Sequence, residues 1–255
     1  MDFTINSIKL FLLVFIRISS FLFAAPFFGS AMILNRVKIG FAFILAWIIY
    51  PAITYNPDLL PNSLITYFIV LFNEIFWGLI IGFVFYIIFI GIQYAGEVIG
   101  IQMGFGIVNV LDPQARIQIS IIGQFFYLVA LIIFISINGH YYLIEAVFRF
   151  FEILPPGAIV FSSKFLDQII KISTMVFFYM FKLGAPVVIT LLLTDIAFGM
   201  IARTVPQMNI FIVGFPIKII VSFVTIILSF SLWGYVFIKL LNSFLVECNN
   251  LIGIL

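Results

Sequence analysis

The sequence predicts an all-α polytopic membrane protein of about six long hydrophobic helices arranged in hairpins. Hydrophobic residues make up 65% of the 255-residue chain, and charged residues only 9%. A soluble domain carries roughly 25% charged residues and about 45–50% apolar ones. The chain therefore has too little polar surface to cover a water-soluble globule. We expect lipid or other apolar protein to surround it, and its 34 phenylalanines suit either environment.

Six apolar runs are candidates for membrane helices. A hydrocarbon core about 30 Å thick takes roughly 20 apolar residues of helix to cross. The second run is short for this purpose. The third is long enough that tilt, a kink or protrusion from the bilayer must absorb its excess length. The six runs are, in order, Ile8–Phe28, Ile39–Thr54, Leu64–Ile92, Ile119–Ile137, Ile169–Leu193 and Ile210–Leu241.

The start of the chain and its two longest connections refine this layout. The first ten residues, MDFTINSIKL, lack the basic segment and cleavage site of a signal peptide, so we expect the first run to remain a membrane helix. The connection 138–167 contains the break Pro155–Pro156–Gly157, and a second polar interruption covers 194–209.

Several classes of function are excluded by composition. The net charge of +2 does not provide a strongly basic face for nucleic acid. The single cysteine, Cys248, cannot form an internal disulfide or a cysteine-based metal cluster, and the single histidine, His140, cannot form a His–His site. No nucleophile–base set, zinc motif or phosphate-binding loop is present. We therefore expect no enzyme, no cofactor and no metal.

Charged residues inside the predicted spans need a physical reason. Such residues cost about 2.5–3.5 kcal/mol each near a helix centre on insertion scales. One interpretation is that they pair across a helix bundle or reach an interface. The alternative is an ion or proton pathway, as in an ion-coupled small-solute transporter that uses Glu74 and the intramembrane lysines. The residues are Arg17, Glu74, Lys182 and Lys218.

Glycines recur at four-residue spacing in two places. Gly78 and Gly82 form one pair, and Gly96 and Gly100 begin a series that continues to Gly104. Residues four apart lie on one helix face, and glycine lets another backbone approach it closely. The partner helix belongs either to the same chain or to a different one, and the sequence leaves both open.

The central segment is expected to be a helix that breaks into a loop at membrane depth. Gly106 weakens helix continuation, and Asp112–Pro113 disfavours helix at Asp112. Non-helical backbone at this depth is tolerated only when it is buried in protein or lines an aqueous path. The segment is therefore a candidate pore or plug. The candidate gate residues are Met103, Gly104, Phe105, Gly106, Ile107, Val108, Asn109, Val110, Leu111, Asp112, Pro113 and Gln114.

Several stretches in collinear order resemble one family. They are GEVIGIQMGFGIVNVLDPQ (96–114), GQFFYLVALIIFISINGHYYLI (123–144) and PVVITLLLTDIAFGMIARTVPQMNIFIVGFPIKII (186–220), with RISSFLFAAPFFGS (17–30) before them. The chain is similar in these stretches to the flagellar biosynthetic FliR family. These proteins are export-gate subunits, related to the T components of type III secretion. The resemblance covers nearly the whole chain.

The resemblance implies a function and a set of partners. It implies a core subunit of the type III export gate, in a helical assembly with P- and Q-type subunits and with B-type and A-type export components as neighbours. Unfolded export substrates would cross the inner membrane through this multi-pass assembly in the flagellar basal body. It further implies one domain over 1–255, with a P-like N-terminal portion and a Q-like C-terminal hairpin. The family's plug loop maps onto approximately Phe105–Gln114.

Overall fold

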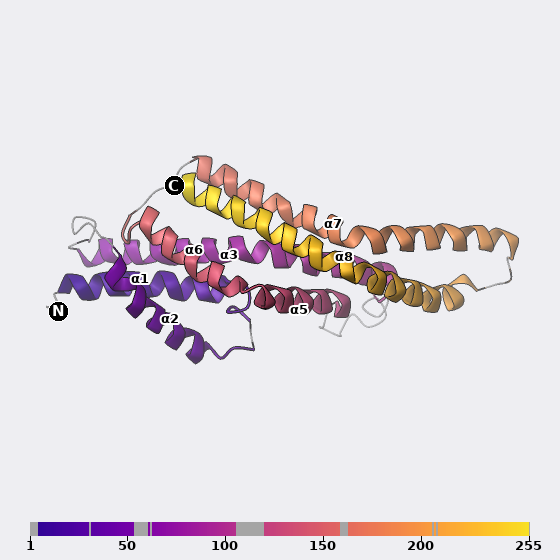
Figure 1. The fold of residues 1–255 in the computed structure, drawn as a ribbon, viewed down its shortest axis with the longest axis horizontal. Helices are drawn as coiled ribbons and strands as arrows, with labels where there is room; N and C mark the ends of the chain where they lie inside the picture. Colours follow the sequence, from indigo (N-terminus) through magenta and orange to yellow (C-terminus); the bar gives the residue numbers. More distant parts are fainter. Residues whose placement is uncertain are drawn as a thin grey trace. The chain divides into compact units, whose positions relative to one another are not determined.

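The computed structural model of the chain is built from α-helices and one 3-10 helix, and no strand occurs among the residues that it describes. Those residues are 5–30, 32–53, 61, 63–105, 120–158, 163–205, 207 and 209–254. The predicted all-α class is confirmed. The elements, coloured along the chain in Figure 1, are α1 (Ile5–Ala24), α2 (Asn35–Ile49), η1 (Tyr50–Ala52), α3 (Leu64–Met103), α5 (Ile121–Ser136), α6 (Gly139–Ile153), α7 (Ser163–Thr204) and α8 (Ile210–Ile254).

Four of these helices are long and apolar enough to cross a membrane. They are α1, α3, α7 and α8, and the pair α5 and α6 adds a fifth if it counts as one broken span. Two of the six predicted runs are therefore shorter helices than expected. α2 has 15 residues and gives way to η1, where Pro51 has no N–H to continue the helical hydrogen bonds. α5 ends at Ser136, just before Asn138 adopts a left-handed conformation with φ of 58°.

Three of the helices, α3, α7 and α8, are longer than a single crossing requires. α3 has 40 residues, α7 has 42 and α8 has 45. At 1.5 Å per residue, α3 alone is about 60 Å long, twice the thickness of a hydrocarbon core of about 30 Å. The third predicted run therefore continues well past Ile92, and the glycine series at 96 and 100 belongs to the same helix.

The chain divides into two compact units. The first comprises Met1–Ile87, Phe134–Ser173 and Leu245–Leu255, and the second comprises Ile88–Ile133 and Thr174–Phe244. In the first unit Trp77 is fully buried, with its ring centroid 4.9 Å from that of Phe165 and 5.5 Å from that of Phe150. In the second, the rings of Phe126 and Trp233 lie 4.5 Å apart. Each unit thus has an aromatic core of its own.

Glycines let α3 approach α1 within the first unit. A Cβ on Gly78 would lie too close to the carbonyl oxygen of Arg17 and to Ser20 Oγ, and one on Gly82 would lie 2.8 Å from the carbonyl oxygen of Phe21. Real Cβ atoms essentially never lie this close to another backbone. The four-residue spacing therefore serves a helix contact inside this chain.

Replacing Gly78 by alanine should destabilise the packing of α3 on α1, because the added methyl group has no room beside the α1 backbone. Overpacking of this kind costs about 1–3 kcal/mol. Gly40→Ala in α2 is the matched control, since nothing lies within 4 Å of its Cβ position. Thermal unfolding of the purified chain in detergent should show a lower midpoint only for Gly78→Ala. Equal midpoints for the two variants would contradict the close contact.

Candidate functional site

A buried ion pair joins α1 to α3 in the first unit. Arg17 lies in α1 and Glu74 in α3, and both side chains are 0% exposed. The Arg17 guanidinium donates from Nε to Glu74 Oε2. From Nη1 it also donates to the carbonyl oxygen of Leu154 at 2.7 Å. Two of the charged residues singled out in the sequence are therefore each other's partners.

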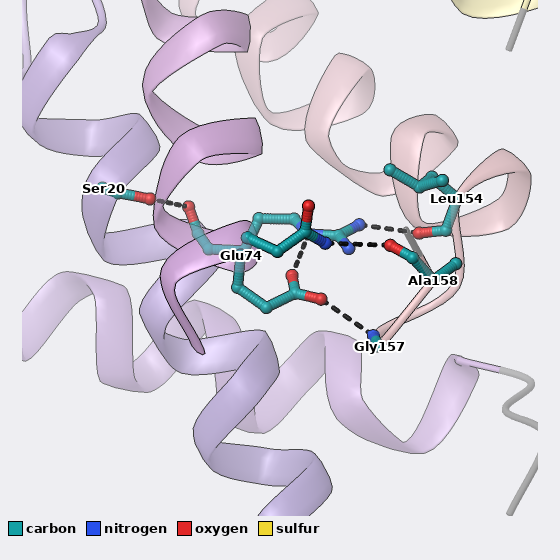
Figure 2. Close-up of polar contacts among 7 residues, drawn as sticks. Ser20, Glu74, Leu154, Gly157 and Ala158 are labelled. Atoms are coloured by element: carbon teal, nitrogen blue, oxygen red, sulfur yellow. Dashed lines mark hydrogen bonds and ion pairs between the residues drawn. The ribbon is translucent and has the colours of Figure 1, made fainter. Parts of the chain in front are cut away.

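The same carboxylate holds the turn between α6 and α7. Gly157 N–H donates to Glu74 Oε1 at 2.8 Å (Figure 2). Pro155 and Pro156 have no N–H, so Gly157 carries the first donor available in this turn. Gly157 has φ of 91°, and Ala158 N–H donates to the carbonyl oxygen of Pro155 at 3.1 Å. A type II turn has this form, with proline followed by a glycine of positive φ, and here it presents its donor to Glu74.

Neighbouring groups complete this cluster. Asn73 Nδ2 donates to the carbonyl oxygen of Ala158 at 2.9 Å and so attaches the turn to α3 a second time. Cζ of Arg17 lies 4.5 Å from the ring centroid of Phe151, within the range in which a guanidinium is attracted to a ring face. Nη2 of the same arginine is buried and has no hydrogen-bond acceptor among the residues that the structure describes. The guanidinium is thus held by a carboxylate, a carbonyl and an aromatic ring.

The geometry of this cluster favours a structural role over proton transfer. Both oxygens of Glu74 accept hydrogen bonds within the described part of the chain, one from Arg17 and one from Gly157. A relay needs an oxygen that can take up and release a proton, and neither of these is open to solvent. Removing one member of a buried pair leaves the other charge uncompensated, which is strongly destabilising. The arrangement therefore holds α1, α3 and the 154–158 turn together.

The two lysines singled out in the sequence lie in the second unit and differ from each other. Lys218 of α8 forms an ion pair with Asp195 of α7. Lys182 is exposed on α7, and its Nζ lies 5.0 Å from the ring centroid of Phe178. No ion pair links Lys182 to a carboxylate among the residues that the structure describes.

Sequence reasoning missed Asp195 as a partner, although a signal was present. Asp195 and Lys218 stand at nearly equal distances from the connection at 205–209, so an antiparallel hairpin brings them level. It also missed Asn73, which stands next to Glu74 in the sequence, and the backbone partners at 154–158. The 154–158 turn is eighty or more residues from Asn73 and Glu74 along the chain, and only the folded first unit brings it beside them.

The candidate gate begins where α3 ends, in the second unit. Gly104 has φ of 98°, Gly104 N–H donates to the carbonyl oxygen of Ile101 at 3.0 Å, and Phe105 N–H donates to that of Gly100 at 3.1 Å. These two bonds form a Schellman motif, which satisfies carbonyls at the end of a helix. Met103 is fully buried. The rest of the predicted gate, Gly106–Gln114, lies outside the described residues.

The glycines before this helix end also make contacts inside the chain. A Cβ on Gly96 would lie 2.7 Å from the carbonyl oxygen of Ile122 and 2.8 Å from Cα of Gly123. One on Gly100 would lie 2.8 Å from Ser120 Oγ. Residues 120–123, which follow the undescribed segment, therefore pack against the C-terminal part of α3, which precedes it. Among the described residues, no group of three His, Cys, Asp or Glu side chains is placed to hold a metal ion.

Comparison with known proteins gives a consistent set of relatives. The family model described as "Bacterial export proteins, family 1" matches residues 8–244. The chain is 39% identical over 247 residues to the flagellar biosynthetic protein FliR of Bacillus subtilis (strain 168), which covers 96% of this chain and 93% of that protein. It is 30% identical over 226 residues to FliR of Aquifex aeolicus (strain VF5), covering 87% and 85%. It is 28% identical over 207 residues to FliR of Escherichia coli (strain K12), covering 81% and 78%.

Replacing Glu74 by alanine should lower the free energy of unfolding by about 3–5 kcal/mol, because Arg17 then remains buried without its counter-charge. Thermal unfolding in detergent measures this loss. The double variant Arg17→Met/Glu74→Leu should recover much of it, since it removes both charges together. The matched control is Glu145→Ala, which breaks an ion pair with Arg149 whose side chains are 51% and 52% exposed. We expect about 0.5 kcal/mol or less there. A double variant no more stable than Glu74→Ala would contradict the pairing.

Proposed function

Because the chain belongs to the FliR family of bacterial export proteins, we propose that it is a core channel subunit of the flagellar type III export gate. In this function it helps unfolded flagellar proteins cross the bacterial inner membrane. The family match over residues 8–244 carries the proposal. The all-α fold with at least four helices able to cross a membrane agrees with a channel component.

The proposed partners are the other membrane components of the gate. P- and Q-type subunits would complete the channel, with a P-like N-terminal portion and a Q-like C-terminal hairpin in this chain matching them. B-type and A-type components would lie beside it in the flagellar basal body. The exposed apolar side chains of α7 and α8 support such contacts, because those helices bury only 28% and 22% of their most apolar windows within the chain.

The proposed gate is the segment Gly104–Gln114. Two observations support it. α3 ends at Met103 through a glycine-dependent cap, and the described chain resumes at Ser120, whose side chain lies beside Gly100. A segment anchored at two neighbouring points can move without disturbing the helices that hold it. Apolar side chains in it would exclude water and ions while the channel is shut, and export would displace them.

The cluster around Glu74 has a structural part in this proposal. It would keep α1, α3 and the 154–158 turn in one arrangement while substrates pass through the assembly. The transporter alternative has no comparable support, since Glu74 and Lys218 each already have a partner of opposite charge. We also propose that the chain is not an enzyme, and that energy for export is supplied by other components.

Deleting residues 107–111 should make the inner membrane permeable to small solutes, because the shortened segment no longer fills the channel. Swelling of spheroplasts in iso-osmotic sorbitol measures the leak. A strain that lacks the whole chain is the control and should stay sealed, because no channel assembles. If the deletion variant exports flagellar proteins normally and its membrane stays sealed, the gate assignment is wrong.

The chain should purify from mild detergent together with P- and Q-type subunits, because its apolar outer surface is covered by them. Size and subunit content of the purified particle, determined by mass spectrometry, test this expectation. Loss of the chain should also abolish export of flagellar proteins. A stable monomer without companions, from cells whose export survives loss of the chain, would overturn the proposed function.

A further inference from the structure

An ion pair gives a reference level for positions along the hairpin formed by α7 and α8 in the second unit. Asp195 and Lys218 bond to each other across the two antiparallel helices, so they lie at the same level. From there α8 runs through the twenty charge-free residues 219–238 to Lys239. Twenty residues of helix span about 30 Å, the thickness of a hydrocarbon core. The two lysines therefore mark the two boundaries of an apolar layer.

Lys182 lies inside this layer. It precedes Asp195 by thirteen residues along α7, which is about 20 Å of helix. It is then about 10 Å, or two helical turns, from the other boundary. A lysine reaches the interface from near the end of a span, whereas one at this depth needs a partner. Within the described chain, the ring of Phe178 is the only interaction partner of Lys182 Nζ.

The surface around Lys182 is apolar and unusually aromatic. Phe177, Phe178 and Phe181 are 62%, 56% and 68% exposed. We propose that this face of α7 is a docking surface for a helix of another subunit, which presents an aspartate or glutamate to Lys182 at membrane depth. The inference rests on the proposed function, which supplies the assembly to which that subunit belongs.

A protein carboxylate fits the site better than a lipid phosphate. Phosphates lie outside the hydrocarbon core, about 10 Å from the level of Lys182, whereas a helix can carry a carboxylate at any depth. In low-dielectric surroundings a cation and a carboxylate attract strongly, and a ring face alone compensates much less of the charge. The exposed phenylalanines would pack against the same helix and exclude water from the pair.

Substitutions at Lys182 distinguish a docking surface from a lipid-facing surface, because the two predict opposite effects of removing the charge. Lys182→Met removes a charge from a lipid-facing position at no cost, but it leaves a partner's carboxylate unpaired if the face is a docking surface. We expect Lys182→Met to reduce co-purification with P- and Q-type subunits and flagellar export by at least about tenfold. Lys182→Arg should retain both, because the charge is kept. Lys239→Met, at the layer boundary, is the matched control and should behave as wild type.

Cross-linking in native membranes tests the contact directly. A carbodiimide that activates carboxylates should join Lys182 Nζ to an aspartate or glutamate in an apolar segment of another chain, and mass spectrometry should identify the joined peptides. The product should be absent in Lys182→Arg. Modification of Lys182 by a membrane-impermeant amine reagent, or an anionic lipid that co-purifies only when Lys182 is present, would overturn the proposal.

The outcome that would contradict the docking surface differs from the one that would contradict the proposed export function. If Lys182→Met assembles and exports like wild type, the docking surface is wrong while the export function stands. If the wild-type chain purifies alone and its loss leaves export intact, the proposed function itself is wrong.

Discussion

The need to satisfy polar groups in apolar surroundings governs this protein. Arg17 and Glu74 are fully buried, and each charged group is met by the other and by backbone groups of a distant turn. Without water, an unpaired charge or peptide group has no other source of compensation. The helices are therefore placed relative to one another, inside each unit, by where their polar atoms find partners.

Helix proximity and polar pairing depend on each other. Gly78 lies one turn after Glu74 on α3 and lets α3 approach the backbone of α1 near Arg17. A larger residue there would separate the two helices and lengthen the ion pair. In the second unit, Gly96 and Gly100 bring the residues around Ser120 against α3 in the same way. Small residues thus set how closely neighbouring helices and their polar groups approach.

Under the proposed function, an export channel has two opposing requirements, which different parts of this chain would meet. Its frame must keep its shape as substrates pass, and its gate must move. In this proposal the buried cluster around Glu74 belongs to the frame. The segment proposed as the gate begins after a glycine cap that ends α3 cleanly, so its displacement need not unwind the helix.

The sequence alone determined the membrane environment, the all-α class and the family, because these follow from composition, run length and collinear motifs. It also marked Arg17, Glu74, Lys182 and Lys218 as residues that need partners, since charge in an apolar run is visible without a fold. Tertiary structure identified the partners of Arg17, Glu74 and Lys218. The contact between Glu74 and Gly157 joins residues 83 positions apart, and no local pattern encodes it. Tertiary structure also decided the helix lengths, because the continuation of a helix past an apolar run depends on caps and packing and not on hydropathy.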